Sequence, residues 1–322
     1  RVFGGAYQGS GVGGYSFGNR RELGTPVALY LYQGARIAVL SPRLSLNYEW
    51  NFGLSFGWKP YDREENPADI MIGSRMNAYI NTGFYLDYLL SPRVNLLAGV
   101  TLTHFSNGNT RFPNAGLNMI DCKAGVAYHI NRTEASLPSL AERRAVPAFP
   151  RHMSYDLVAF GSWRRKGYFE EDRFVPSPSA YKVLGASFAA MYNVSYKFRV
   201  GAAVDWVYDA SANVFVLRDL SRESGFVEPP FDAQTAWGLS GRVEYVMPYF
   251  IVGIGMGTNV LHRGGDLKSF YQMLLLKIAV TRNLFLHVGY NLKDFRDPNF
   301  LMLGVGFRFN NKYPVLDRRL AR

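Results

Sequence analysis

The sequence predicts an all-β fold: a transmembrane antiparallel up-and-down β-barrel of about 14 strands, or alternatively about 12. Two observations favour this class: side chains alternate between apolar and polar along many segments, and short turns alternate with long polar loops. A third is the lack of any run of about 18 predominantly apolar residues, which a transmembrane helix would need. Because backbone groups in a bilayer must be paired internally, a closed barrel is the other structure that crosses a membrane.

Alternation is clearest in three segments, because neighbouring side chains of a strand point to opposite faces. Residues 76–90 place apolar side chains such as Ile80 and Phe84 on one face and polar ones such as Asn81 and Asp87 on the other. The same alternation recurs at residues 198–208 and 284–293. A strand with an apolar face opposite a polar face is typical of membrane barrels.

Connection lengths separate this class from a soluble β-sandwich, whose strands also alternate. Very short turns are expected at residues 90–93, 193–197, 247–249 and 281–283. Longer polar loops are expected near residues 59–74, 107–116, 167–179, 210–233 and 261–269. Short turns at one end and long loops at the other are typical of outer-membrane barrels, whose short turns face the periplasm.

The predicted organisation is a single barrel over residues 1–309, followed by a C-terminal periplasmic tail at 310–322. Residues 131–152, which are rich in Pro, Arg and Ala, form a long insertion on the periplasmic side. An even strand number places both termini in the periplasm. The strands are expected at residues 10–19, 26–34, 42–57, 75–90, 93–106, 117–130, 153–165, 181–194, 197–208, 235–247, 250–260, 269–281, 284–293 and 300–309.

The net charge of +11 suits an anionic partner. Nucleic acid is not expected, because the basic residues are scattered rather than gathered on one helix or patch. Lipopolysaccharide presents phosphates at the rim of a barrel, so lipid A/LPS and the surrounding outer-membrane lipid are the better candidates. A solvated surface explains the same scattered charge and is the simpler interpretation. The single cysteine, Cys122, excludes an intramolecular disulfide, and no cysteine pair has metal-ligand spacing.

No cofactor and no structural metal are expected. Acidic residues do gather in two loops, at residues 62–65 with Asp69 and at residues 170–172. Their carboxylates could bind a divalent cation that bridges lipid A phosphates. Solvated loop charge explains the same residues and is the simpler interpretation.

Residues able to carry chemistry concentrate in the hairpin over residues 93–130. His104 and Ser106 continue the apolar face that includes Leu102, so both side chains are expected to face lipid. On the return strand, Asn118 falls on the same face and near the same rim. A polar or ionisable side chain exposed to hydrocarbon is costly and tends to be functional.

The same hairpin resembles a known family. Residues 103–108, with the sequence THFSNG, and residues 113–118, with the sequence PNAGLN, resemble the signature of the lipid A 3-O-deacylase (PagL) and acyloxyacyl hydrolase-like family. The upstream residues 61–77 are similar to the larger members found in Bacteroidota. The resemblance covers roughly residues 24–131, and the later strands match only as a barrel. It implies a bacterial outer-membrane protein that hydrolyses an acyl ester.

Carried over to this chain, the resemblance implies that Ser106 is the nucleophile and His104 its general base, because an imidazole must take the hydroxyl proton. Donors at the turn, from Asn107 and from the backbone of Gly108 and Asn109, would stabilise the tetrahedral oxyanion. Each such donor is often worth roughly 3 kcal/mol.

The third member departs from the family pattern. Asn118 stands where characterised deacylases of the family have a Glu that orients the histidine. An amide can hold an imidazole by hydrogen bonding but cannot offset the imidazolium charge, and in a serine protease the Asp-to-Asn change costs about 10⁴ in rate. Asp121 is a poor replacement, because alternation points its side chain to the other face.

Two functions therefore follow from the sequence. The first is an outer-membrane serine esterase that removes an ester-linked acyl chain, at the 3-O position, from lipid A. The alternative is a catalytically weak or inactive barrel that acts as a channel, a scaffold or a partner of an outer-membrane or secretion assembly. A protein partner would bind through residues 131–152 or 310–322.

Overall fold

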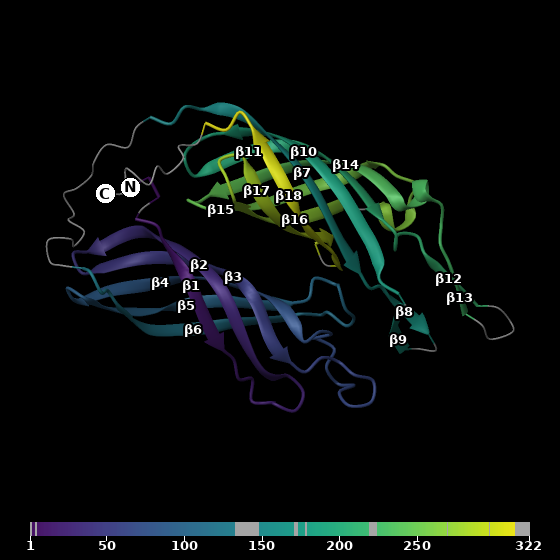
Figure 1. Ribbon diagram of the computed structural model, residues 1–322, viewed down its shortest axis with the longest axis horizontal. Helices are drawn as coiled ribbons and strands as arrows, with labels where there is room; N and C mark the ends of the chain where they lie inside the picture. Colours follow the sequence, from purple (N-terminus) through teal and green to yellow (C-terminus); the bar gives the residue numbers. More distant parts are fainter. Residues whose placement is uncertain are drawn as a thin grey trace. The chain divides into compact units, whose positions relative to one another are not determined.

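The computed structural model describes residues 2–3, 5–132, 148–170, 173–177, 179–218, 224–268, 270–295 and 297–312. The regular structure of these residues is almost entirely antiparallel β-strand, which confirms the all-β expectation. Contacts divide the chain into two compact units, Arg1–Asn107 with Pro113–Ala148 and Gly108–Phe112 with Phe149–Arg322. In Figure 1 the strands of the first unit run from purple to teal and those of the second from teal to yellow. No helix in the described part of the chain is long and apolar enough to cross a membrane.

The first unit is a six-stranded sheet in which strands pair with their sequence neighbours, so β1 and β6 are its edges. Its strands are β1 (Tyr7–Gly14), β2 (Gly24–Ser41), β3 (Leu44–Trp58), β4 (Met76–Ser91), β5 (Val94–Ser106) and β6 (Leu117–Tyr128). On β4, Phe84 and Leu86 are exposed, whereas Asn81 and Tyr85 are buried. One face of the sheet is thus apolar and exposed, and the other carries polar and aromatic groups.

Aromatic rings pack on the second face, beneath the end of β5. Phe105 is completely buried and makes edge-to-face contacts with Trp58 and Tyr15, at centroid distances of 4.9 and 5.0 Å. Such aromatic pairs stabilise a fold beyond the area they bury. Because Phe105 lies between His104 and Ser106 in the sequence, this cluster anchors the part of β5 that carries both residues.

The second unit is a closed barrel of eight strands, because β18 pairs back with β7. Its strands are β7 (His152–Arg164), β10 (Tyr181–Asn193), β11 (Phe198–Asp209), β14 (Thr235–Val246), β15 (Phe250–Leu261), β16 (Phe270–Ala279), β17 (Leu284–Lys293) and β18 (Asp297–Phe309). Its loops hold the hairpins β8 (Gly167–Glu170) with β9 (Arg173–Pro176) and β12 (Phe215–Arg218) with β13 (Ser224–Val227), and the 3-10 helices η2 (Phe231–Gln234) and η3 (Gly265–Leu267). Eight strands leave an interior that side chains can fill.

Side chains fill the lumen of this barrel in two layers. The layer nearer the short turns is an ion network, in which Asp156 binds Lys277 at 2.7 Å and Arg308 at 2.8 Å. Arg199 contacts Asp156 at 3.1 Å and Glu244 at 3.5 Å, and Lys277 also binds Glu244. A second layer is apolar and lies mostly nearer the long loops, although Phe285 lies beside Lys277 and Arg308 of the ion network. It consists of Val158, Phe160, Val183, Tyr271, Met273, Leu275, Phe285, Phe300 and Met302.

The structure does not confirm one barrel of about 14 strands. Every strand segment expected from the sequence is present, but six form the sheet of the first unit and eight form the closed barrel. Alternation marks a strand without specifying its partner, whereas closure depends on which edge strands pair. The hairpins β8–β9 and β12–β13 occupy the predicted loops at 167–179 and 210–233.

Two segments with predicted roles fall largely outside the described residues. Residues 133–147, the main part of the insertion expected at 131–152, are not among them. The same holds for residues 313–322 of the predicted tail at 310–322. Binding of a protein partner through either segment stays a prediction.

Candidate active site

Strands β5 and β6 form the hairpin that brings the predicted catalytic residues together. The register of the two strands pairs His104 directly with Asn118. Ser106 lies two residues further along β5, so its side chain is on the same face as that of His104. Three side chains from two strands therefore gather at the end of the hairpin where the long loop begins.

Two hydrogen bonds connect these three side chains. Nε2 of His104 lies 2.9 Å from Oγ of Ser106, and Nδ1 of His104 lies 2.7 Å from Oδ1 of Asn118. Because an amide oxygen is only an acceptor, it favours the imidazole tautomer whose Nδ1 carries the proton. Nε2 is then unprotonated and can accept the serine proton. The geometry fits an imidazole base beside a hydroxyl nucleophile.

The face that carries these three residues is apolar and exposed. Val100 and Leu102 on β5 are 54% and 48% exposed, and Ile120 on β6 is 84% exposed. Ser106 is itself buried, whereas Asn118 is exposed. The apolar surface of β5 and β6 thus extends along both strands as far as the polar side chains of His104, Ser106 and Asn118.

A ladder of hydrogen bonds on the opposite face holds the strands in register. Asn51 donates to Asn81, and Asn81 donates to Thr103, each at 2.8 Å. Thr103 in turn donates to Asp121 on β6 at 2.8 Å. The Asp121 carboxylate therefore points away from His104 and cannot orient its ring. Sequence reasoning missed this ladder, although alternation places its β5 and β6 members on one face.

The loop after β5 lies close against the imidazole. The N–H of Asn107 donates to Oδ1 of Asn114 at 2.8 Å, which closes the start of the loop. Gly116 has a φ of +73°, in the left-handed region that favours glycine. A Cβ at Gly116 would lie 3.3 Å from Cε1 of His104 and 3.6 Å from Cβ of Ser106. Glycine at this position lets the backbone approach both residues without strain.

A second loop, between β3 and β4, supports the first. The N–H of Gly116 donates to the carbonyl of Met71 at 3.1 Å. Asp69 shapes this second loop, because its Oδ1 accepts the N–H groups of Met71 and Ile72 at 2.9 and 3.0 Å. Burial raises the pKa of the Asp69 carboxyl and outweighs these two N–H donors, which lower it.

The predicted oxyanion donors have different surroundings. The backbone N–H of Asn107 donates to Oδ1 of Asn114 and is therefore already engaged within the loop. Gly108 and Asn109 belong to the second unit, and both have a φ of +64°. The side chain of Asn109 donates to the carbonyl of Asn299 at 3.0 Å. A role for these residues in an oxyanion hole stays a prediction.

The acidic loop at residues 62–65 is organised by its own backbone. Asp62 accepts the N–H groups of Glu65 and Glu64 at 3.0 and 2.9 Å, and both bonds lower the pKa of its carboxyl. Within the described ranges, no three His, Cys, Asp or Glu side chains lie where they could share a metal ion. Residues 171 and 172 of the other acidic loop are outside those ranges.

Two family models match the chain. The model described as lipid A 3-O-deacylase (PagL) matches residues 6–127, and the model described as the C-terminal domain of acyloxyacyl hydrolase matches residues 153–311. The chain belongs to the lipid A 3-O-deacylase family. Membership in this family confirms the resemblance seen in residues 103–118 and places the protein in the bacterial outer membrane.

The two family models fall on the two structural units. The deacylase model covers the six strands of the first unit, including the hairpin of β5 and β6. The C-terminal model covers the closed barrel. The lipid A 3-O-deacylase signature therefore lies in the first unit. Among curated proteins, none matches the chain.

Solved structures that resemble the chain are distant membrane barrels. The KdgM porin in complex with disordered oligogalacturonate is 8% identical, with 95% of this chain and 98% of that chain covered, at a TM-score of 0.23. Salmonella typhi OmpF in complex with daunomycin is 9% identical, with 94% and 96% covered, at a TM-score of 0.21. No statement about function follows from likenesses this distant.

Proposed function

We propose that this member of the lipid A 3-O-deacylase family hydrolyses the ester that links an acyl chain to the 3-O position of lipid A. Ser106 is the nucleophile, His104 its general base, and Asn118 the residue that orients the base. The observation that carries the proposal is the pair of hydrogen bonds at the two nitrogens of His104, 2.9 Å to Ser106 and 2.7 Å to Asn118.

The surroundings of the three residues support a lipid substrate. They continue an exposed apolar face, so an acyl chain lying along β5 and β6 would bring its ester to Ser106 from the hydrocarbon side. They also lie at the long-loop end of the strands, which faces the cell exterior in outer-membrane barrels. The ester bonds of lipid A lie at that boundary of the outer leaflet.

In the first half of the proposed reaction, Oγ of Ser106 attacks the ester carbonyl carbon while its proton passes to Nε2 of His104. The tetrahedral intermediate then collapses and the ester C–O bond breaks. The imidazolium returns the proton to the departing sugar oxygen. The products of this half are an acyl-serine and lipid A with a free 3-hydroxyl group.

In the second half, water attacks the acyl-serine carbonyl and gives its proton to Nε2 of His104. Collapse of this intermediate releases the fatty acid and restores Ser106. The side-chain amide of Asn107 and the backbone N–H groups of Gly108 and Asn109 are the proposed oxyanion donors, each worth about 3 kcal/mol. Both halves are acyl transfers, so the proposed reaction uses no cofactor.

Asn118 positions the imidazole without neutralising its charge. The large loss that a carboxylate-to-amide change causes in serine proteases comes chiefly from the wrong histidine tautomer. Here the amide oxygen faces Nδ1 of His104, which keeps the productive tautomer. We therefore expect an active enzyme with a slower chemical step than relatives that have a Glu at this position.

Mass spectrometry of lipid A tests this proposal. The chain is produced in a Gram-negative host whose lipid A retains its 3-O-linked hydroxyacyl chains, and tandem fragmentation locates any chain that is lost. Wild-type protein is expected to remove a 3-O-linked chain, and Ser106→Ala to leave it in place. Ser10→Ala makes the same change at an exposed position of β1 and is expected to behave as wild type.

Each other outcome overturns a defined part of the proposal. Loss of a chain from another position refutes the 3-O specificity. Equal deacylation by Ser106→Ala refutes Ser106 as the nucleophile. Unchanged lipid A in cells whose outer membrane contains the folded wild-type protein refutes the activity.

A further inference from the structure

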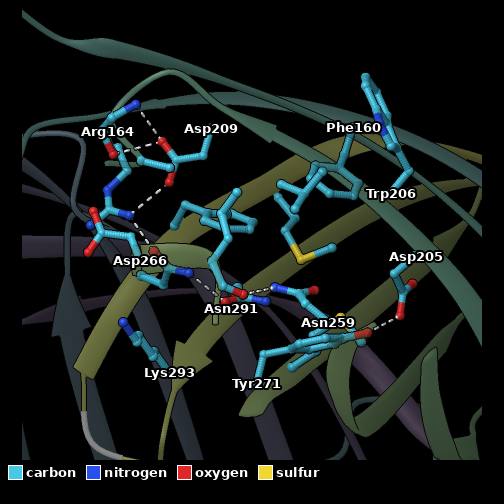
Figure 2. Close-up of a pocket in the computed structure, with 18 of the residues that line it drawn as sticks. Phe160, Arg164, Asp205, Trp206, Asp209, Asn259, Asp266, Tyr271, Asn291 and Lys293 are labelled. Atoms are coloured by element: carbon cyan, nitrogen blue, oxygen red, sulfur yellow. Dashed lines mark hydrogen bonds and ion pairs between the residues drawn. The ribbon is translucent and has the colours of Figure 1, made fainter. Parts of the chain in front are cut away.

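The long-loop end of the closed barrel holds a cavity of about 120 Å³ that the deacylation chemistry does not use. Figure 2 shows Arg164, Asp209, Asp266 and Lys293 gathered at one end of this cavity and Tyr271 at the other. We propose that the cavity binds one acidic sugar residue, which enters from the cell exterior. This binding site goes beyond the proposed deacylase, because every residue that lines it belongs to the second unit.

The cavity is closed toward the short turns. Phe160, Phe300 and Met302 line it and are buried members of the apolar layer. Beyond them the ion network around Asp156 and Lys277 fills the lumen. A molecule that enters between the long loops must therefore leave by the same route, so the cavity is suited to binding and not to passage.

Two ion pairs give the cavity a preorganised wall. Arg164 binds Asp209 at 3.1 Å, and their side chains are only 13% and 5% exposed. Lys166 pairs with Asp266. Burial would raise the pKa of the Asp266 carboxyl, but the hydrogen bond and charge of Lys166 lower it by more. The Asp266 carboxyl is thus held ionised, and each of the two carboxylates is paired with one cation.

Lys293 supplies a positive charge that no such pair balances. Its side chain lines the cavity, yet it forms neither a hydrogen bond nor an ion pair with any residue that the structure describes. It acts on Asp266 only as a more distant charge. Nε of Arg164 is also buried without a hydrogen-bond partner among those residues. A ligand carboxylate would compensate Lys293 and offer an acceptor to Arg164.

The remaining polar groups fit hydroxyls. Asn259, Asn291 and Asn299 present amides along the wall, and each amide both donates and accepts. A sugar hydroxyl does the same, so it can bond to an amide and to a carboxylate such as Asp209 at once. The ring of Phe300 provides an apolar surface for the C–H face of a pyranose.

Charge and size together select the ligand class. An inorganic anion offers no donor for the acceptor positions that remain on the amides and carboxylates of the wall, and a neutral sugar would leave Lys293 uncompensated. A sugar with a carboxylate matches both sets of groups. The volume is below the roughly 300–1,000 Å³ of pockets that enclose drug-sized ligands, so it suits one sugar residue at the end of a glycan.

Titration of the detergent-solubilised full-length chain with D-glucuronate, D-glucose and inorganic phosphate tests the inference, with saturation-transfer NMR and calorimetry as readouts. D-Glucuronate is expected to bind saturably and at least about tenfold more tightly than D-glucose, the effect of one charge-assisted contact. Lys293→Gln is expected to remove that preference. Lys268→Gln, an equal charge change at an exposed loop position outside the cavity, is expected to leave it intact.

Four results would overturn the inference: no saturable binding of D-glucuronate, equal affinity for D-glucose, an unaltered preference in Lys293→Gln, or displacement of the sugar by equimolar phosphate. The comparison of D-glucuronate with D-glucose uses wild-type protein, so it does not depend on the folding of a variant. Ser106→Ala is expected to bind D-glucuronate as wild type does. The sugar site and the deacylase are therefore tested independently, and failure of one proposal would not refute the other.

Discussion

Oδ1 of Asn118 lies 2.7 Å from Nδ1 of His104, at the ring nitrogen that does not face Ser106. This contact determines which nitrogen carries the proton, and so whether Nε2 can act as a base. In the proposed reaction, the orientation of one amide thus controls the reactivity of Ser106 on the neighbouring strand.

Substitution of Asn118 is expected to change the rate in both directions. Asn118→Glu should raise the rate of fatty-acid release about tenfold or more, because a carboxylate keeps the tautomer and also stabilises the imidazolium. Asn118→Ala should lower it about tenfold, because the ring loses its orienting partner. Release from lipid A in mixed micelles measures both, with Cys122→Ala on the same face of β6 as control. A faster Asn118→Ala variant would contradict the positioning role.

Gly116→Ala is expected to lower the rate about 10²-fold, the effect of a displacement of roughly 1 Å at a catalytic group. The new Cβ would lie 3.3 Å from Cε1 of His104 and in a left-handed backbone conformation. Gly18→Ala is the matched control, because Gly18 has a φ of +76° but no neighbouring atom within 4 Å. Equal losses in the two variants would attribute the effect to backbone strain and not to contact with the imidazole.

Asp69 is expected to make the loop between β3 and β4 sensitive to pH. Burial raises the pKa of its carboxyl in the folded chain, so folding favours the protonated form. Loop stability should therefore increase as the pH falls through the folded pKa toward the unfolded value of about 3.9. Asp69→Asn keeps the acceptor for the N–H groups of Met71 and Ile72 and should abolish this increase. Hydrogen-exchange protection of those two N–H groups measures it, and protection that rises with pH in the wild type would contradict the assignment.

Asp156→Asn is expected to destabilise the closed barrel by about 3–5 kcal/mol, because removal of one partner leaves buried cations without compensation. The temperature at which the folded form disappears on a denaturing gel reports this loss. Asp232→Asn breaks the exposed pair with Arg263 and should cost no more than about 1 kcal/mol. Similar melting of the two variants would show that the network around Asp156 is not a main determinant of stability.

Properties that depend on sequence neighbours could be predicted, whereas properties that depend on distant pairing could not. The common face of His104 and Ser106 follows from a period of two residues, and the placement of Asn118 follows from the alternation of the return strand. The pairing of β18 with β7 is not encoded in any such period. Nor is the contact between Asp156 and Lys277, whose positions are 121 residues apart.

The same distinction applies within the hairpin. Its signature residues were recognisable because they lie in one hairpin, at residues 103–108 and 113–118, and are therefore close in sequence. The hydrogen-bond ladder from Asn51 to Asp121 was not recognised, because it crosses four strands. Each of its members, taken alone, is an ordinary polar residue on the polar face of its strand. Gly116 was likewise unremarkable in the sequence, since its importance lies in the approach of its backbone to His104.

The direct pairing of His104 with Asn118 has a consequence for the unfolded chain before it is inserted into the membrane. A slip of one residue between β5 and β6 would turn the amide to the opposite face, because side chains alternate. Before the hairpin forms, the imidazole has no orienting partner and the serine is as unreactive as one in a peptide. Under the proposed mechanism, a newly exported polypeptide would therefore not hydrolyse the lipids it meets in transit, and pairing of β5 with β6 would itself create the active site.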